Sequence, residues 1–163
     1  MRKITLLISL ILPLSLFAVQ YHSIPGNGNN IAWSHEKNGN SCGNNCAPNW
    51  GNDSIFLYHF SSQGTVNWNS GSYLYVGDGG EINIGNNSNW TVNSKIFVDS
   101  NGAINTSNSF DLTINGSGWF EVVYGGSFVV GNNLNVINNG TFIISGNMTS
   151  GNNADIFFKE VLT

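Results

Sequence analysis

The sequence predicts an all-β protein: a right-handed parallel β-solenoid (β-helix) with about three short strands per coil of roughly 22 to 24 residues. Short apolar segments recur along the chain, Gly and Asn residues separate them, and the inward-type residues keep one parity. Segments rich in branched and aromatic side chains between such turn residues are typical of β-strands. Repeats of this length are typical of solenoids, in which each repeat packs only on its neighbours.

The longer period comes from the turn residues. The pairs Gly79-Gly80, Asn101-Gly102 and Gly125-Gly126 recur with a period of roughly 22 to 24 residues, within the range of solenoid repeats. Three strands with their turns, at about eight residues each, fill such a period, which favours a triangular coil. We expect Ser54 to Phe60 to form the first strand and residues 64–158 to hold about four coils.

The parity of the apolar residues separates a solenoid from a β-sandwich, which is the alternative fold. Alternate residues of a strand face the same side of a sheet. A persistent parity means that each turn consumes a similar number of residues, which is expected of stacked coils and is not required of a Greek key. The predicted inward set is even-numbered: Val66, Trp68, Leu74, Val76, Ile82, Ile84, Val92, Ile96, Val98, Ile104, Phe110, Leu112, Ile114, Phe120, Val122, Phe128, Val130, Leu134, Val136, Phe142 and Ile144.

Residues 1–18 have the layout of an export signal. Arg2 and Lys3 form the charged region, residues 4–12 are mostly apolar, and Ala18 offers a small residue for cleavage. The apolar run is too short to span a bilayer, so we expect a secreted or cell-surface, extracellular protein with no membrane span after signal removal. We divide the chain into a signal peptide (1–18), an irregular cap segment with a disulfide (19–60), the β-solenoid (61–158) and a tail (159–163).

The charge of the remaining chain argues against nucleic acid as a partner. After signal removal, three lysines stand against nine carboxylates, a formal charge of −6, and no arginine remains. Nucleic acids and acidic membrane surfaces attract basic surfaces. The chain also lacks the guanidinium group that grips carboxylates and phosphates in a bidentate manner.

The segment Cys42-Gly43-Asn44-Asn45-Cys46 is the most specific local motif. Export places the two cysteines in an oxidising compartment, which predicts a disulfide between Cys42 and Cys46. A metal site would need His22, His35 or His59 to join them, and no histidine has a recognised ligand spacing. We therefore expect neither a metal nor a cofactor.

The order of segments resembles a known group of proteins. A signal peptide precedes a Trp- and Cys-bearing segment, then the stretch Pro48 to Leu57, then iterated G-x-I-x-I/V pieces. This order resembles the N-terminal region of large secreted surface proteins of gliding bacteria that leave the cell by the type IX secretion route. The resemblance implies an adhesin-like role. Those proteins usually end in a sorting domain, and nothing after Phe158 resembles one.

Outward aromatic residues are the strongest functional feature. Tyr73, Tyr75, Phe97 and Trp119 have odd numbers, opposite to the predicted inward set. Exposed aromatic patches mark binding sites, and flat rings beside Asn and Ser suit a sugar face and its hydroxyls. We therefore predict a structural or adhesion module that binds an extracellular glycan or another cell-surface component. The alternative role of these rings is a stabilising ladder between coils.

Two further functions stay open on the sequence. A polysaccharide-active enzyme, a lyase or a hydrolase, would use paired carboxylates. Asp99 and Glu121 are both odd-numbered and one predicted coil apart, so they are candidates for stacking on neighbouring coils, although we assign no catalytic residue. An ice- or crystal-surface binder would need a flat Thr array, and Thr91, Thr113 and Thr141 are scattered.

Both ends of a solenoid need a cover, because an open strand edge is prone to aggregate. At the N-terminal end, Trp33, Trp50 and the disulfide are expected to cap the first coil. At the other end, Asp155 to Phe158 is expected to form one more strand with little chain after it. We therefore expect self-association, or continuation of the stack, through the C-terminal coil.

Overall fold

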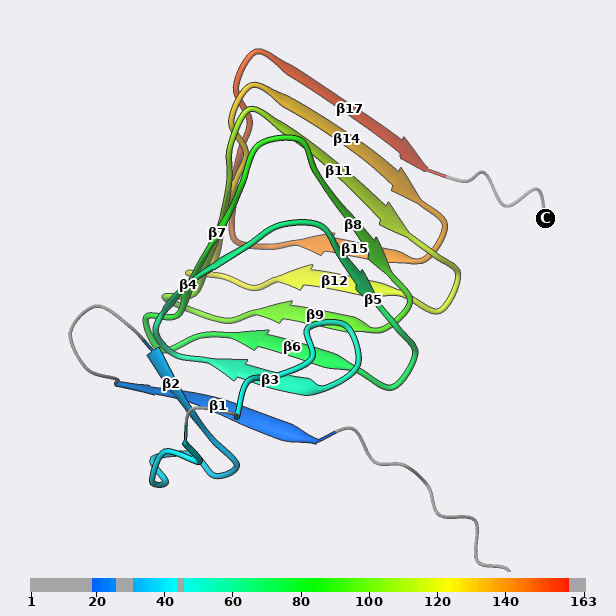
Figure 1. Ribbon diagram of the computed structural model, residues 1–163. Coiled ribbons are helices and arrows are strands. Elements are labelled where there is room, and N and C mark those ends of the chain that lie inside the picture. The colour runs from blue at the N-terminus through cyan, green and yellow to red at the C-terminus, as the bar shows by residue number, and fades with distance from the viewer. Residues whose placement is uncertain (1–18, 26–30, 44–45, 159–163) are drawn as a thin grey trace, which may run out of the picture.

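A computed structural model describes residues 19–25, 31–43 and 46–158 of the chain (Figure 1). Within these ranges the regular elements are all β-strands. The predicted signal peptide (1–18), the tail (159–163) and Asn44 and Asn45 of the cysteine motif lie outside the described residues. The architecture is a triangular coil whose turns stack along one axis, as Figure 1 shows.

Five turns of three strands each follow one another from Ser54 onward. The first three turns are β3 (Ser54–Leu57), β4 (Phe60–Gln63) and β5 (Val66–Trp68), then β6 (Tyr73–Val76), β7 (Glu81–Ile84) and β8 (Ser88–Val92), then β9 (Lys95–Val98), β10 (Ala103–Thr106) and β11 (Ser109–Ile114). The last two are β12 (Trp119–Val122), β13 (Ser127–Val129) and β14 (Asn133–Asn138), then β15 (Thr141–Ile144), β16 (Asn147–Thr149) and β17 (Asn153–Phe158).

Each strand pairs in parallel with its counterpart one turn later, so three sheets run along the coil. Sheet A holds β3, β6, β9, β12 and β15; sheet B holds β4, β7, β10, β13 and β16; sheet C holds β5, β8, β11, β14 and β17. The predicted parallel β-solenoid is confirmed. The segment from Ser54 to Phe60, expected as one strand, instead forms β3 and the start of β4. The first turn of the solenoid therefore begins at Ser54.

A hairpin precedes the first turn. Strand β1 (Gln20–Pro25) extends sheet A in parallel with β3, and β2 (Ile31–Ser34) pairs antiparallel with β1. Trp33 and Trp50, the expected cap residues, are partly buried and pack against the core. Trp50 lies between Trp33 and the buried Trp68, with ring centroids 6.0 and 6.1 Å apart. The N-terminal end of the core is therefore covered by aromatic side chains.

The register explains why the parity persists. Ile82 pairs with Ile104, and Ile104 in turn pairs with Phe128, so both offsets are even. Even offsets keep even-numbered residues inward, because side chains alternate along each strand. Between the first two turns, Ile55 pairs with Leu74, which is an odd offset. The inward residues of β3 consequently have odd numbers.

The core is one continuous cluster of buried apolar side chains. Every residue of the predicted inward set from Val66 to Val136 is buried. Phe142 and Ile144 in the last turn are partly buried and pack against the same cluster. Inside the core, Trp68, Trp90 and Phe110 contact one another edge-on from turn to turn, with ring centroids 5.4 and 5.8 Å apart. Side chains of like kind thus repeat along the axis, as stacked repeats require.

The corner between sheets A and B explains the glycine-containing pairs. At Gly102, a Cβ atom would collide with the carbonyl oxygen of Val76 in the preceding turn, so only glycine fits. The residue before each such position has a positive φ, 89° at Gly79 and 61° at Asn101. Left-handed backbone of this kind is tolerated by Gly and, to a lesser degree, Asn. The second residue of each pair must be glycine because the backbone of the preceding turn lies close to it, and the first residue must tolerate a positive φ. These two requirements explain the pairs that recur in the sequence.

Candidate functional site

The outward side of sheet A collects aromatic side chains from four consecutive turns. We call Phe56, Tyr73, Tyr75, Phe97 and Trp119 the aromatic face. The register aligns Phe56, Tyr75 and Phe97 in one row and Tyr73 and Trp119, with Lys95 between them, in the neighbouring row. All five are partly exposed. The four aromatic residues predicted from the sequence are therefore brought together on one face.

The rings of the aromatic face contact one another. Tyr75 and Phe97 stack with centroids 6.1 Å apart and planes 16° apart, and Phe56 lies 6.0 Å from Tyr75. Tyr73 meets Phe56 edge-on at 5.6 Å. His22 of β1 continues the row, with its ring 4.5 Å from that of Phe56. Such contacts stabilise neighbouring turns, so the face is rigid as well as partly exposed.

Charged side chains frame the aromatic face. The ammonium group of Lys95 lies 5.2 Å from the ring centres of both Phe97 and Trp119. The Nε1–H of Trp119 donates a hydrogen bond to Oε2 of Glu121 at 2.8 Å, and this carboxylate lies 4.0 Å from Lys95 Nζ. Asp99 accepts a hydrogen bond from the Tyr75 hydroxyl at 2.7 Å. Each charge thus holds an aromatic side chain in place.

Asp99 and Glu121, the candidates for stacking on neighbouring coils, are not in register. The register pairs Glu121 with Phe97, so Asp99 lies two positions beyond the residue that Glu121 faces. Their spacing in the sequence is two positions shorter than the offset between β9 and β12. In this arrangement the two carboxylates serve different aromatic partners, Tyr75 and Trp119.

A cleft of 620 Å³ lies where the loop after β2 meets the first corners of the solenoid. Lys37 Nζ reaches Asp78 Oδ2 at 3.3 Å across it and lies 4.6 Å from the centre of the Tyr58 ring. Tyr58 also lies 5.8 Å from Tyr75, ring to ring, so the cleft adjoins the aromatic face. The other side chains of its wall include Ser23, Ile24, Asn38, Asn40 and His59.

A hydrogen-bonded clasp joins the hairpin to the solenoid beside this cleft. The hydroxyl of Ser23 accepts from the Tyr58 N–H at 2.7 Å and lies 3.0 Å from His59 Nδ1. The Ser23 hydroxyl thus links the backbone of Tyr58 to the imidazole ring of His59. Ser23 is only 2% exposed. A serine buried in this way docks β1 onto the first corner of the solenoid.

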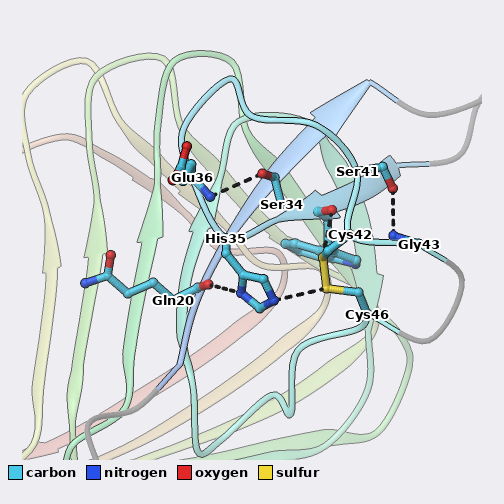
Figure 2. The surroundings of a disulfide bond; sticks show 9 residues. Gln20, Ser34, His35, Glu36, Ser41, Cys42, Gly43 and Cys46 are labelled. Atoms are coloured by element: carbon cyan, nitrogen blue, oxygen red, sulfur yellow. Dashed lines mark hydrogen bonds between the residues drawn. A yellow bond between two sulfur atoms is a disulfide. The ribbon is translucent and has the colours of Figure 1, made fainter.

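The predicted disulfide between Cys42 and Cys46 is confirmed. The Cys42 N–H donates to the Trp33 carbonyl at 2.9 Å, which ties the loop to β2. Figure 2 shows the His35 ring between the Gln20 carbonyl and Cys46, with Nδ1 3.1 Å from that oxygen and Nε2 3.6 Å from Sγ. The donor atoms of His35 and the two cysteines lie within 4.8 Å of one another, but the disulfide occupies both sulfurs. The arrangement therefore serves to fix the loop.

The threonines form no extended array in the described part of the chain. Thr91 and Thr113 pair on sheet C, but the adjacent positions in their row are Asn67 and Ile137. Thr141 belongs to sheet A. The arrangement therefore gives no separate support to an ice-binding surface.

Sequence reasoning missed Phe56 and the cleft. Phe56 has an even number and faces outward because β3, like β4, is in the opposite phase to the later strands. The cleft forms from segments distant in the chain: Lys37 and Asp78 are 41 residues apart. Only the docking of the hairpin brings them together, and no local pattern predicts that contact.

Comparisons with protein families, curated proteins and solved structures found no match for this chain. The class of protein therefore follows from the fold itself, a parallel β-solenoid with an N-terminal hairpin and a disulfide. In the described ranges, no helix meets the length and apolarity needed to cross a membrane.

Proposed function

We propose that this protein is a secreted or cell-surface structural and adhesion module that binds glycans with its aromatic face. One observation carries the proposal: five aromatic side chains from four turns lie in two adjacent rows on the outward side of one sheet. Aromatic side chains gathered on an outward face are uncommon unless they bind something.

The chemistry of the aromatic face suits sugars. The C–H faces of a sugar ring pack against aromatic rings, and hydroxyl-bearing or charged groups at the rim fix orientation. Here the rim carries one cation and two carboxylates, Lys95, Asp99 and Glu121, each already held by an aromatic partner. Because neighbouring turns brace these side chains, little side-chain entropy is lost when a ligand binds.

The location is part of the proposal. The disulfide Cys42–Cys46 is typical of proteins that work in an oxidising compartment. The export signal expected at residues 1–18 and the resemblance to type IX-secreted surface proteins of gliding bacteria agree with that location. Solenoids in general offer long, rigid side surfaces, which suits attachment to an extended polymer.

Affinity electrophoresis tests the proposal. The purified chain from residue 19 would be run through native gels that contain xylan, glucomannan, cellulose derivatives or chitosan, each compared with a plain gel. We expect at least one neutral polysaccharide to retard the protein. Trp119→Ala should reduce the retardation roughly tenfold, because it removes a ring and its contact area.

The matched control is Tyr124→Ala. Tyr124 is an aromatic residue that is 87% exposed and lies at a corner, outside the aromatic face. Its loss should leave retardation unchanged, and both variants should keep the thermal unfolding midpoint within a few degrees. No retardation in any gel, or equal loss in both variants, would contradict the proposal. Release of new reducing ends from the same polysaccharides would instead assign a cleaving activity.

A further inference from the structure

The cleft beside the aromatic face has the size and the lining of a second, more selective binding site. Its volume of 620 Å³ lies within the usual range for small-molecule sites, about 300–1,000 Å³. Tyr58 and Ile24 provide apolar wall, whereas Lys37, Asp78 and His59 provide charged or polar atoms. It is therefore a mixed cleft of the kind that orients a polar ligand.

The charges of the cleft favour an uncharged ligand. Lys37 and Asp78, a cation and a carboxylate, form an ion pair with atoms 3.3 Å apart. An anionic ligand that paired with Lys37 would meet the charge of Asp78, and a cationic ligand would meet that of Lys37. A neutral ligand with several hydroxyl groups can donate to the carboxylate and accept from the ammonium at once.

The hydrogen-bonding groups of the cleft suit hydroxyls. Ser23 contacts Nδ1 of His59, and Nε2 of a histidine ring can donate to or accept from a ligand hydroxyl. The loop wall adds the side-chain amides of Asn38 and Asn40. Donors and acceptors thus surround a space with an aromatic wall.

We infer that this cleft binds a neutral sugar unit, one or two rings in size, of the glycan that lies on the aromatic face. The inference rests on the proposed function, since Tyr58 of the cleft adjoins Tyr75 of the aromatic face at 5.8 Å. The aromatic face supplies area for a long chain, and the cleft supplies selectivity for one unit of it.

The experiment uses methyl glycosides of glucose, galactose, mannose and N-acetylglucosamine, with methyl glucuronide as the acidic probe. Calorimetric titration of the purified chain should show binding of at least one neutral glycoside and weaker binding of the glucuronide. Asp78→Asn should weaken the neutral sugar roughly tenfold, because a charged acceptor is replaced by a neutral one. It should also reverse the preference toward the glucuronide, since Lys37 is then unpaired.

The variant is chosen to preserve the fold. Asp78 has a φ of 52°, a left-handed conformation that Asn adopts readily. Asp111→Asn, at an exposed carboxylate on sheet C, is the matched control and should change nothing.

The outcomes separate this inference from the proposed function. Retardation by polysaccharide gels without binding of any methyl glycoside would contradict the sugar site in the cleft. It would still support glycan binding by the aromatic face. Glycoside binding that Trp119→Ala abolishes and Asp78→Asn spares would also overturn it. If the wild-type chain binds neither polysaccharide nor glycoside, both proposals fail.

Discussion

The hydroxyl of Tyr75 donates a hydrogen bond to Oδ2 of Asp99, 2.7 Å away and one turn further along the solenoid. The bond ties β6 to the corner after β9 and holds the ring of Tyr75 against Phe97. Burial raises the pKa of Tyr75 above its ordinary value of 10.0, and the hydrogen bond to Asp99 and its negative charge raise the pKa further. The folded protein therefore holds this proton more firmly than the unfolded chain does.

This contact predicts a loss of stability at alkaline pH. A raised pKa in the folded state contributes stability that is fully present below pH 10.0, the unfolded value, and is lost as pH rises above it. The unfolding free energy would be measured in urea at about pH 9 and about pH 11. Its decrease between these two pH values should be smaller for Tyr75→Phe than for the wild type. Some dependence should remain, because burial also raises the pKa values of Tyr73 and Tyr58. Equal pH dependence in the two proteins would count against a raised pKa of Tyr75 in the folded state.

His22 predicts the opposite behaviour on acidification. Its ring is buried against Phe56, and burial, followed by the nearby charge of Lys37, lowers its pKa below the ordinary value of 6.5. A lowered pKa contributes stability that is present above pH 6.5 and is lost as pH falls below it. Among the described residues, His22 Nδ1 has no hydrogen-bond partner, so the protonated ring has no acceptor in place there.

His22→Phe tests this prediction because phenylalanine keeps the stacked ring and cannot take up a proton. Amide hydrogen exchange of β1 and β2 should accelerate in the wild type between about pH 7 and pH 5, after correction for intrinsic rates, and much less in the variant. His35→Phe would not serve as a control, since His35 bonds the Gln20 carbonyl of the same strand. His59→Gln would disturb the Ser23 clasp and is unsuitable for the same reason. Each exchange rate of His22→Phe is therefore compared with that of the wild type at the same pH. Identical acceleration in both proteins would show that another group is responsible.

The fold was predictable because its dominant signal is local. Parity and the period of turn residues follow from backbone geometry, and both appear directly in the sequence. The phase of β3 and β4 was not predictable in the same way. Ile55 faces inward with an odd number because its offset to Leu74 is odd, and the parity changes only between Ser61 of β4 and Val66 of β5.

The abundance of asparagine was only partly interpretable. In the sequence, asparagine marks turns between the apolar segments, yet the described asparagines with positive φ are only Asn38, Asn87 and Asn101. Others bond to each other between turns: Asn115 to Asn93 at 2.7 Å, Asn132 to Asn108 at 2.9 Å and Asn153 to Asn133 at 3.0 Å. These pairs depend on register, which composition does not reveal.

The candidate site was half predictable for the same reason. Odd numbering identified Tyr73, Tyr75, Phe97 and Trp119 because they lie where the even offsets hold. The cleft depends on contacts between the loop after β2 and two corners of the coil, and its ion pair joins Lys37 to a residue 41 positions later. Contacts between segments so far apart in the chain produce no periodic pattern in the sequence, so the cleft could not be predicted from it.

The stacked corner predicts a difference between two glycines. Gly102→Ala would drive a Cβ into the carbonyl oxygen of Val76, and this backbone cannot move without disturbing two turns. We expect a loss of about 1–3 kcal/mol in unfolding free energy, as for other forced overpacking. Gly64→Ala is the control, because no atom lies within 4 Å of a Cβ there and its φ is not left-handed. It should be neutral or slightly stabilising. Equal effects in urea unfolding would refute this account of the glycine corners.

The last described strand, β17, predicts association along its unpaired edge. Its residues Ile156, Phe157 and Phe158 are 37%, 59% and 65% exposed. Ile156 and Phe158 are in register with the inward-facing Val136 and Asn138 of β14, so they belong to the core side of the coil. Among the described strands, β17 pairs only with β14, which leaves its other edge open to a further strand. Apolar side chains beside an open strand edge favour pairing with another chain or coil.

We expect the purified chain from residue 19 to self-associate, with a sedimentation coefficient that rises with concentration. Ile156→Lys and Phe158→Lys should each shift the equilibrium toward the monomer, because either charge would have to be buried at the interface. Ser150→Lys, which adds the same charge at an exposed position just before β17, should leave the association unchanged. A wild-type chain that stays monomeric at high concentration would mean that the edge of β17 is covered by other means. Equal weakening by all three substitutions would mean that net charge, rather than this edge, controls association.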